Sequence, residues 1–249
     1  MKKDNKGYSD VPEILRNYLN YMIVIKGRSE NTVREYYYDL RTFYRYIYTI
    51  ENNLDIYNLE NVCLDNFDED IIFEAINVLA RGGVVLYPTD TVYGLGANIF
   101  DNKAVRRIFD IKQRSFLKPI SILVRDIDAI DLVAKTTLGQ KNTIKSYLPG
   151  PYTFILNKRK IVPRVITSGL VNVGVRVPDC ELACRLASIF PITTTSANLS
   201  DDEVLSNPSE ILEQLDCEVD MVIDVGELKS NHASSIVDLT GFKPKIIRK

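Results

Sequence analysis

R-G-G-V-V-L-Y-P-T-D-T-V-Y-G-L-G-A-N, residues 81–98, is the stretch that decides the fold. Its apolar run at 84–87 is short and contains β-branched residues, which is typical of a strand buried on both faces. Pro88 ends that run, and the residues that follow are rich in hydroxyls and glycine. Ligands in open α/β sheets bind just past the carboxyl end of a strand, so residues 88–96 form either a ligand-binding loop or an ordinary connection. Gly94 and Gly96 would then let backbone or ligand approach closely. The pattern is neither G-x-G-x-x-G nor a Walker loop.

The segment P-T-D-T-V-Y-G-L-G-A, residues 88–97, closely resembles the signature of the YrdC-like family. These are the threonylcarbamoyl-adenylate synthases that start the threonylcarbamoyl-adenosine modification of tRNA. Further matches in the same order extend the resemblance from about Asp68 to Lys249. It implies an α/β fold, with a YrdC-like twisted mixed sheet and flanking helices. It also implies an enzyme that joins L-threonine, bicarbonate or CO2, and ATP into threonylcarbamoyl-AMP, with release of pyrophosphate. Mg²⁺ is expected on the ATP phosphates, and a tRNA threonylcarbamoyl transferase complex is expected to take the product.

The composition is that of a globular protein of one or two domains. The chain has 249 residues, of which 45% are hydrophobic and 26% are charged. A formal net charge of −2 argues against a wholly basic protein that coats nucleic acid, although it permits local basic patches. No apolar run approaches the roughly 18 residues of a membrane span, and the polar N-terminus shows no signal peptide. We therefore expect a cytoplasmic location and no membrane contact.

The cysteines and the histidine carry no strong signal. Four cysteines (63, 180, 184 and 217) are too sparse for a disulfide framework. Cys180 and Cys184 lie four apart on a predicted helix and could face one metal, but a structural zinc site needs four ligands and no second pair supports them. We interpret them as reduced, packed thiols. His232, the single histidine, has no partner base or nucleophile at motif spacing and is interpreted as a loop residue.

Two amphipathic helices are predicted near the N-terminus. The first spans residues 10–26, and the second begins after the N-cap Ser29 and carries a stripe of tyrosines and other apolar residues. I-K-G-R-S-E-N-T-V-R-E-Y-Y-Y-D-L-R-T-F, residues 25–43, resembles the core-binding module of the tyrosine recombinases of the Xer and phage-integrase group. In that family the module clamps one side of a DNA duplex.

This second resemblance is confined to about residues 11–70, and the recombinase catalytic residues are missing. Up to Ile50 the balance of charged residues is only +3, a weak signal for contact with a DNA backbone. The module either binds DNA or is a pair of helices whose tyrosines form their packing face. A genuine fusion, a splice of two neighbouring genes and an engineered chimera would all give this sequence. We place the domain boundary at Asp65–Asn66, giving a helical module over 1–65 and a synthase-like domain over 66–249.

The remaining elements are predicted from periodicity and breaker residues. Helices are expected at 68–80, 103–112, 126–134, 138–148 and 182–188. Besides 84–87, strands are expected at 120–124, 153–156, within 169–178, and at 221–224, 235–239 and 245–247.

A basic cluster precedes the strand predicted at 120–124. Lys112, Arg114 and Lys118 lie within seven residues, and cations at the mouth of a strand suit a polyphosphate. The alternative is a solvated turn with ordinary surface charges. The resemblance assigns Arg114 and Lys118 to ATP and makes Lys112 a third phosphate contact.

Arg176 is the one charged residue in the apolar stretch G-L-V-N-V-G-V-R-V-P, residues 169–178. A buried charge is costly unless it is paired. The resemblance gives Arg176 to the threonine carboxylate and Asn172 to the nucleotide, although family members often have Thr at the latter position. By the resemblance, threonine is held by Thr91, Arg176, Thr194 and Ser234, and ATP by Lys112, Arg114, Lys118, Asn172, Ser196, Ser206 and Arg248. No covalent nucleophile is needed, so rate enhancement would come from positioning and charge neutralisation.

Two residues depart from the family pattern. Thr195 stands where proline usually precedes S-A-N, and Asp201 stands where glycine usually follows Ser200. If a positive φ is needed there, Asp tolerates it less well than Gly.

Two rival functions remain open at this point. The same fold forms carbamoyl-adenylate inside larger carbamoyltransferases, which carry acylphosphatase and zinc-finger segments that this sequence does not show. A non-catalytic protein that binds double-stranded RNA or DNA would use a patch made of Arg106, Arg107, Lys112, Arg114 and Lys118.

Overall fold

The computed structural model describes residues 18, 19, 22, 29, 32, 36, 69–229 and 232–248. By its internal contacts the chain divides into two units, Met1–Phe73 and Glu74–Lys249. In the first unit, Leu19 and Met22 are helical and buried, and Ser29 Oγ accepts a hydrogen bond from the backbone N–H of Thr32. That contact confirms the predicted N-cap. The recombinase-like resemblance otherwise lies outside the described residues, and the boundary at 65/66 stays a prediction.

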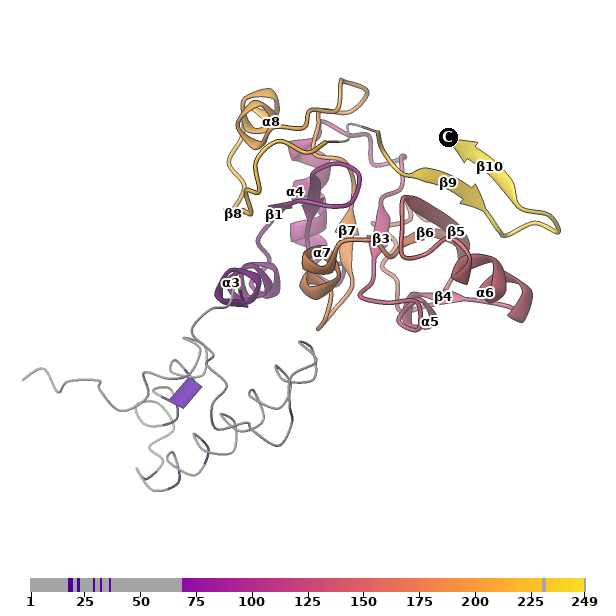
Figure 1. Ribbon diagram of the computed structural model, residues 1–249, viewed down its shortest axis with the longest axis horizontal. Helices are drawn as coiled ribbons and strands as arrows, with labels where there is room; N and C mark the ends of the chain where they lie inside the picture. The colour runs from indigo at the N-terminus through magenta and orange to yellow at the C-terminus, as the bar shows by residue number, and fades with distance from the viewer. Residues whose placement is uncertain are drawn as a thin grey trace, which may run out of the picture. The chain divides into compact units, whose positions relative to one another are not determined.

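The larger sheet of the second unit has seven strands in the order β10-β9-β5-β6-β3-β7, with β4 paired to β5 (Figure 1). Its strands are β3 (Ser121–Leu123), β4 (Ala134–Lys135), β5 (Tyr152–Lys158), β6 (Asn172–Arg176), β7 (Ile192–Thr194), β9 (Ser235–Asp238) and β10 (Lys245–Arg248). The pairs β3–β6 and β5–β9 are parallel, whereas β5–β6, β3–β7 and β9–β10 are antiparallel. The expected mixed sheet is therefore confirmed.

A smaller sheet has the order β2-β1-β8, with β1 (Val85–Tyr87) in the centre. Its neighbours are β2 (Gly94–Gly96), antiparallel to β1, and β8 (Met221–Val222), parallel to it. Single β-bridges from Gly94 to Ser196 and from Asn98 to Ile192 join β2 to the β7 segment of the larger sheet. The two sheets therefore meet along β2 and β7.

Helices flank the sheets, as expected. They are α3 (Glu69–Ala80), α4 (Asn102–Ile111), α5 (Ile130–Val133), α6 (Leu138–Lys145), α7 (Glu181–Leu186) and α8 (Pro208–Leu215). Asp101 caps α4 by accepting hydrogen bonds from the backbone N–H groups of Lys103 and Ala104. Thr137 and Gln140 form a capping box at α6. Within the described part of the chain, no helix combines the length and apolarity that crossing a membrane would require.

Most predicted elements are present, and the differences have local causes. The helix expected at 126–134 is reduced to α5. Before it the chain forms turns: the Asp126 carboxylate accepts a hydrogen bond from the N–H of Ala129, and the N–H groups of Ile130 and Asp131 donate to carbonyl oxygens three residues earlier. Three strands and one helix were not predicted. The strands β2, β4 and β7 are only two or three residues long, and β2 reads G-L-G. The helix α8 follows Asn207 and begins with proline, which is a recognised start signal.

Gly94 and Gly96 lie in β2, beside the ring of Tyr87 on β1. A Cβ atom added to Gly96 would lie 2.9 Å from Tyr87 Cε1, and one added to Gly94 would lie 3.1 Å from Tyr87 Cζ. The two glycines therefore make room for the ring of Tyr87 on the neighbouring strand, and Gly94 also lines the cavity described below.

Candidate functional site

A cavity of about 160 Å³ is lined by residues of both sheets. The loop after β1, the loop before β3, and the ends of β6 and β7 contribute to its wall, together with β9 and β10. Six of the eleven residues assigned from the resemblance line it: Arg114, Arg176, Thr194, Ser196, Ser234 and Arg248. Residues separated by more than a hundred positions are thus brought together in one cavity.

The other five assigned residues do not line the cavity: Thr91, Lys112, Lys118, Asn172 and Ser206. Asn172 begins β6, and Ser206 Oγ donates a hydrogen bond to Glu227 Oε1 at 3.2 Å. Thr91 is buried, and its hydroxyl lies 3.0 Å from that of Thr89. Oδ1 of Asn172 is buried without a hydrogen-bond partner among the described residues. All eleven assignments stay predictions.

The loop after β1 is fixed by Thr89. Its Oγ1 accepts hydrogen bonds from the backbone N–H groups of Thr91 (3.1 Å) and Val92 (3.2 Å), and donates one to the carbonyl of Val92 (2.7 Å). The hydroxyl-rich composition noted in the sequence thus closes a tight turn. That turn sets the position of Asp90.

Asp90 is the partner of Arg176. Nη2 of Arg176 donates to Oδ1 of Asp90 at 2.5 Å, and the two side chains are only 5% and 11% exposed. Burial lowers the pKa of Arg176, and the negative charge of Asp90 opposes that shift. The Nε of Arg176 and the Oδ2 of Asp90 are buried without a hydrogen-bond partner among the described residues. The sequence predicted that Arg176 needs a counter-charge but did not identify Asp90.

Lys112 lies inside the protein instead of on the cavity wall. Its Nζ donates to the carbonyl oxygens of Ser196 and Asn198, both at 2.6 Å, and to Oδ1 of Asn198 at 3.0 Å. Burial lowers the pKa of Lys112 to about 7. These three contacts hold the loop after β7, in which Ser196 Oγ also donates to Asn198 Oδ1. The buried residues Val105, Ile108 and Phe109 precede Lys112 at helical spacing, and this signal could have indicated its burial.

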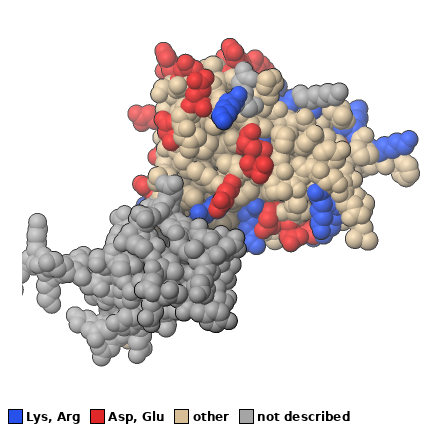
Figure 2. Space-filling model, in the orientation of Figure 1, with Lys and Arg blue, Asp and Glu red and all other residues tan. Residues whose placement is uncertain are grey.

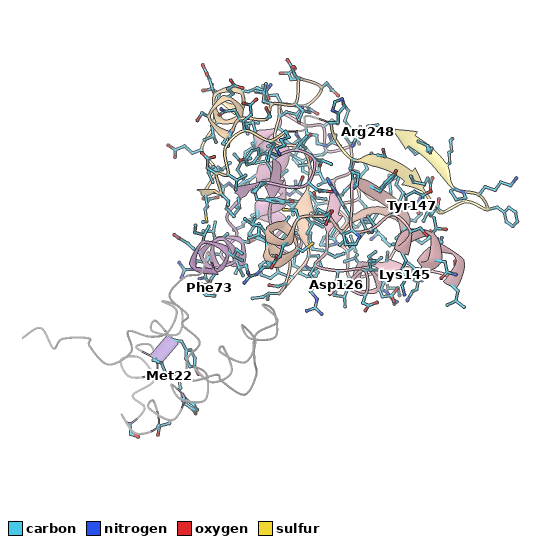
Figure 3. The ribbon with its side chains drawn as sticks, in the orientation of Figure 1. Met22, Phe73, Asp126, Lys145, Tyr147 and Arg248 are labelled. Atoms are coloured by element: carbon cyan, nitrogen blue, oxygen red, sulfur yellow. The ribbon has the colours of Figure 1, made fainter. Side chains whose placement is uncertain are left out.

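Two further arginines give the cavity a positive wall. Arg114 donates to the carbonyl oxygens of Lys118 (3.1 Å) and Pro119 (2.9 Å). Arg248, labelled in Figure 3 at the end of β10, donates twice to the carbonyl of Ser234. Burial lowers the pKa of both guanidinium groups. With Arg176, they form a set of donors suited to carboxylate and phosphate oxygens.

Small hydroxyl-bearing residues line another part of the wall. Thr153 and Ser234 share a hydrogen bond of 2.8 Å between their hydroxyls. Ser121 also lines the cavity, above Gly174, where an added Cβ would lie 2.5 Å from Ser121 Oγ. Neither Ser121 nor Thr153 was predicted, because an isolated hydroxyl in a strand carries no motif. The cavity therefore combines positive charge with hydroxyl groups that can donate and accept hydrogen bonds.

Comparison with known proteins agrees with this picture. A family model named Sua5_yciO_yrdC, described as "Telomere recombination", matches residues 77–249. A putative threonylcarbamoyl-AMP synthase of Methanocaldococcus jannaschii is 40% identical over 170 residues, which cover 68% of this chain and 81% of that protein. The threonylcarbamoyl-AMP synthase of Pyrococcus abyssi is 36% identical over 177 residues, which cover 70% of this chain and 52% of the Pyrococcus abyssi protein.

Solved structures give the same result. The crystal structure of Pyrococcus abyssi Sua5 complexed with L-threonine superposes with a TM-score of 0.69 at 36% identity, over 74% of this chain and 55% of that one. The crystal structure of Escherichia coli YciO gives a TM-score of 0.68 at 33% identity, over 74% and 91% of the two chains. From these matches and the shared fold, the chain belongs to the Sua5/YciO/YrdC family.

Proposed function

We propose that this protein is an L-threonylcarbamoyladenylate synthase, which forms threonylcarbamoyl-AMP and pyrophosphate from L-threonine, bicarbonate or CO2, and ATP. The observation that carries the proposal is the cavity in which Arg114, Arg176 and Arg248 lie beside the hydroxyls of Thr194, Ser196 and Ser234. The relatives named as synthases and the relative solved with L-threonine support it.

We assign the threonine carboxylate to Arg176, whose orientation is set by Asp90. Thr194 and Ser234 line the same cavity and provide hydroxyls for the remaining polar groups of the amino acid. Thr91 would act from behind this wall, since its hydroxyl contacts that of Thr89. The result is a small, polar pocket that suits a short amino acid.

We assign the nucleotide to Arg114, Ser196 and Arg248 on the cavity wall, with Lys118, Asn172 and Ser206 around it. Lys112 contributes indirectly, because its ammonium fixes the backbone on both sides of Ala197 and thus the position of Ser196. A polyphosphate gains from several fixed cations, since these need no reorganisation as charge shifts toward the leaving pyrophosphate.

The reaction needs no covalent intermediate on the protein. The threonine amine adds to CO2 or its activated form, and the carbamate oxygen then attacks the α-phosphorus of ATP with loss of pyrophosphate. When one cavity holds all three substrates, they need not meet by chance in solution. This positioning lowers the activation barrier of the reaction. The arginines stabilise the negative charge that builds up on the phosphates.

Mg²⁺ is proposed as the companion of ATP, because it binds phosphate oxygens and keeps several water ligands. Among the described residues, no group of three or more His, Cys, Asp or Glu side chains is arranged to hold a metal. The ion would therefore be held mainly by the nucleotide, where it neutralises phosphate charge. We further propose that a tRNA threonylcarbamoyl transferase complex consumes the product in the cytoplasm.

The structure does not favour the alternative of a basic patch that binds RNA or DNA. Arg107 pairs with Asp220 at 2.7 Å, Arg106 lies over the ring of Phe116, and Lys112 is buried. On the face in Figure 2, acidic side chains lie among the basic ones. The five cations of the predicted patch are therefore partly engaged within the protein.

The test is pyrophosphate release by the purified chain, with threonine and bicarbonate each present or omitted. Release that requires both substrates supports the proposal, and Arg176→Met should abolish it. Arg125→Met is the matched control, because Arg125 is an exposed arginine paired with its neighbour Asp126 and does not line the cavity. If wild-type protein releases no pyrophosphate with all substrates present, the proposed function is wrong.

A further inference from the structure

Lys118, which is expected to contact the polyphosphate, is already paired with a carboxylate, that of Asp201. Nζ of Lys118 donates to both oxygens of Asp201, at 2.9 and 2.8 Å. Lys118 lies in the loop before β3 and Asp201 in the loop after β7, and the two side chains are 47% and 78% exposed. Hydrogen bonding and attraction from Lys118 lower the pKa of the Asp201 carboxyl, with further attraction from Arg114 and Lys112. The carboxylate of Asp201 thus stays ionised at neutral pH.

The backbone presents Asp201 in a fixed way. On one side, the N–H of Ser200 donates to the carbonyl of Lys112 at 2.8 Å. On the other, Nδ2 of Asn198 donates to the carbonyl of Asp202 at 2.8 Å. Between these anchors Asp201 has φ +76°, a conformation that is unfavourable for most residues other than glycine. The side chain is therefore held toward Lys118 by a backbone geometry that carries a conformational cost.

Lys118 is itself held next to the cavity. Its carbonyl accepts a hydrogen bond from Nε of Arg114, and the next residue, Pro119, lines the cavity with Arg114. A polyphosphate that reaches Arg114 thus comes close to an ammonium already paired with Asp201. Phosphate oxygens and a carboxylate cannot both take the same ammonium donors without sharing them.

From this arrangement we infer that Asp201 sets the affinity for the nucleoside triphosphate by competing with its phosphates for Lys118. The inference rests on the proposed function for the identity of the ligand. When the nucleotide binds, Lys118 exchanges the carboxylate for phosphate oxygens, and when pyrophosphate leaves, Asp201 takes Lys118 back. The carboxylate thus weakens binding of the triphosphate and also assists release of the pyrophosphate product.

The test measures ATP binding by calorimetry in the presence of Mg²⁺, so that it does not depend on turnover. Asp201→Asn removes the charge and keeps a side chain that tolerates positive φ. An exposed ion pair is worth little, so we expect ATP to bind about two- to fivefold more tightly, with the gain shrinking at high salt. Pyrophosphate should bind more tightly by a similar factor, whereas threonine binding should not change.

Two controls separate competition for Lys118 from general charge effects. Asp202→Asn makes the same charge change one residue away and should leave ATP affinity unchanged. In a Lys118→Met background, Asp201→Asn should give little further gain, because the contested ammonium is gone. The inference is overturned if Asp201→Asn does not tighten ATP binding, if Asp202→Asn tightens it equally, or if the gain persists in full without Lys118.

The outcomes keep the two proposals apart. Tighter ATP binding by Asp201→Asn without any pyrophosphate release would support the inference and refute the synthase function. Normal pyrophosphate release with unchanged ATP affinity in Asp201→Asn would support the synthase function and refute the inference. Failure of wild-type and Asp201→Asn protein to bind ATP would refute both.

Discussion

Replacing Asp90 by Asn should both destabilise the protein and weaken threonine binding. The substitution keeps the size of the side chain and removes its charge. Arg176 would then remain buried, 5% exposed, without its only carboxylate partner among the described residues. The unpaired Nε of Arg176 shows that few other acceptors are within reach. The variant therefore measures how much the negative charge of Asp90 contributes to stability.

The expected loss follows from the burial of the pair. Breaking a buried ion pair by removing one partner typically costs about 3–5 kcal/mol, because the remaining charge is desolvated and uncompensated. Arg176 also lines the cavity, so water can solvate part of its guanidinium group. We therefore expect the lower end, a loss of about 3 kcal/mol in the free energy of unfolding.

The assay is urea denaturation followed by far-UV circular dichroism, since the chain has no tryptophan to report by fluorescence. Asp201→Asn is the matched control, because it breaks an exposed ion pair and should change stability far less than Asp90→Asn does. In folded Asp90→Asn protein, the KM for threonine should rise more than the KM for ATP. If Asp90→Asn costs no more than the control, Arg176 does not depend on Asp90, and our account of the site is wrong.

Three further substitutions test the frame around the cavity. Gly96→Ala should lower the free energy of unfolding by about 1–3 kcal/mol, since its Cβ would lie 2.9 Å from a ring carbon of Tyr87. Gly139→Ala, in α6 with no atom within 4 Å of the added Cβ, is the control and should raise that free energy by about 0.5–1 kcal/mol. Similar shifts in melting temperature for the two variants would contradict this. Thr89→Ala should cost about 1–3 kcal/mol in denaturation, because two backbone N–H groups lose their acceptor, and Thr89→Ser should restore most of it. Tyr87→Phe loses a hydrogen bond of 3.2 Å to the Thr193 carbonyl and should cost about 0.5–1.5 kcal/mol at pH 8. Burial raises the pKa of Tyr87 from 10.0 to about 12, so its contribution is complete below pH 10 and is lost as pH rises through 12. The deficit of Tyr87→Phe should therefore shrink between pH 10 and 12, and a constant deficit would show that folding does not raise the pKa of Tyr87.

Some features of the site could be predicted from the sequence because they depend on local pattern. The apolar run before Pro88 predicted β1, and the lone charge in the stretch 169–178 predicted that Arg176 is buried and paired. The motif resemblance predicted six residues of the cavity wall. These signals can be read from the sequence, because apolar runs, periodicity and motifs are properties of short segments.

Other features depend on contacts between distant segments. Asp90 pairs with a residue 86 positions away, and nothing in the letters P-T-D-T distinguishes a buried acid from an exposed one. Lys112 was grouped with Arg114 and Lys118 by proximity in the sequence, although the periodicity of α4 turns Lys112 inward. The sequence showed Asp201 only as a residue at a position where glycine is usual, and only the folded chain shows that its carboxylate reaches Lys118.

The route that the chain takes around the cavity has a consequence for folding. Its wall starts at Thr89, after β1, and is completed by Arg248, on β10. No short segment contains even half of the wall, so the binding surface forms only after contacts between remote parts of the sequence are made, and such contacts form slowly. Ligand binding should therefore appear in a refolding experiment as a late event, after most helical signal has returned. A substrate that binds this cavity would stabilise the folded state and should therefore slow hydrogen exchange in β10 as well as in β1.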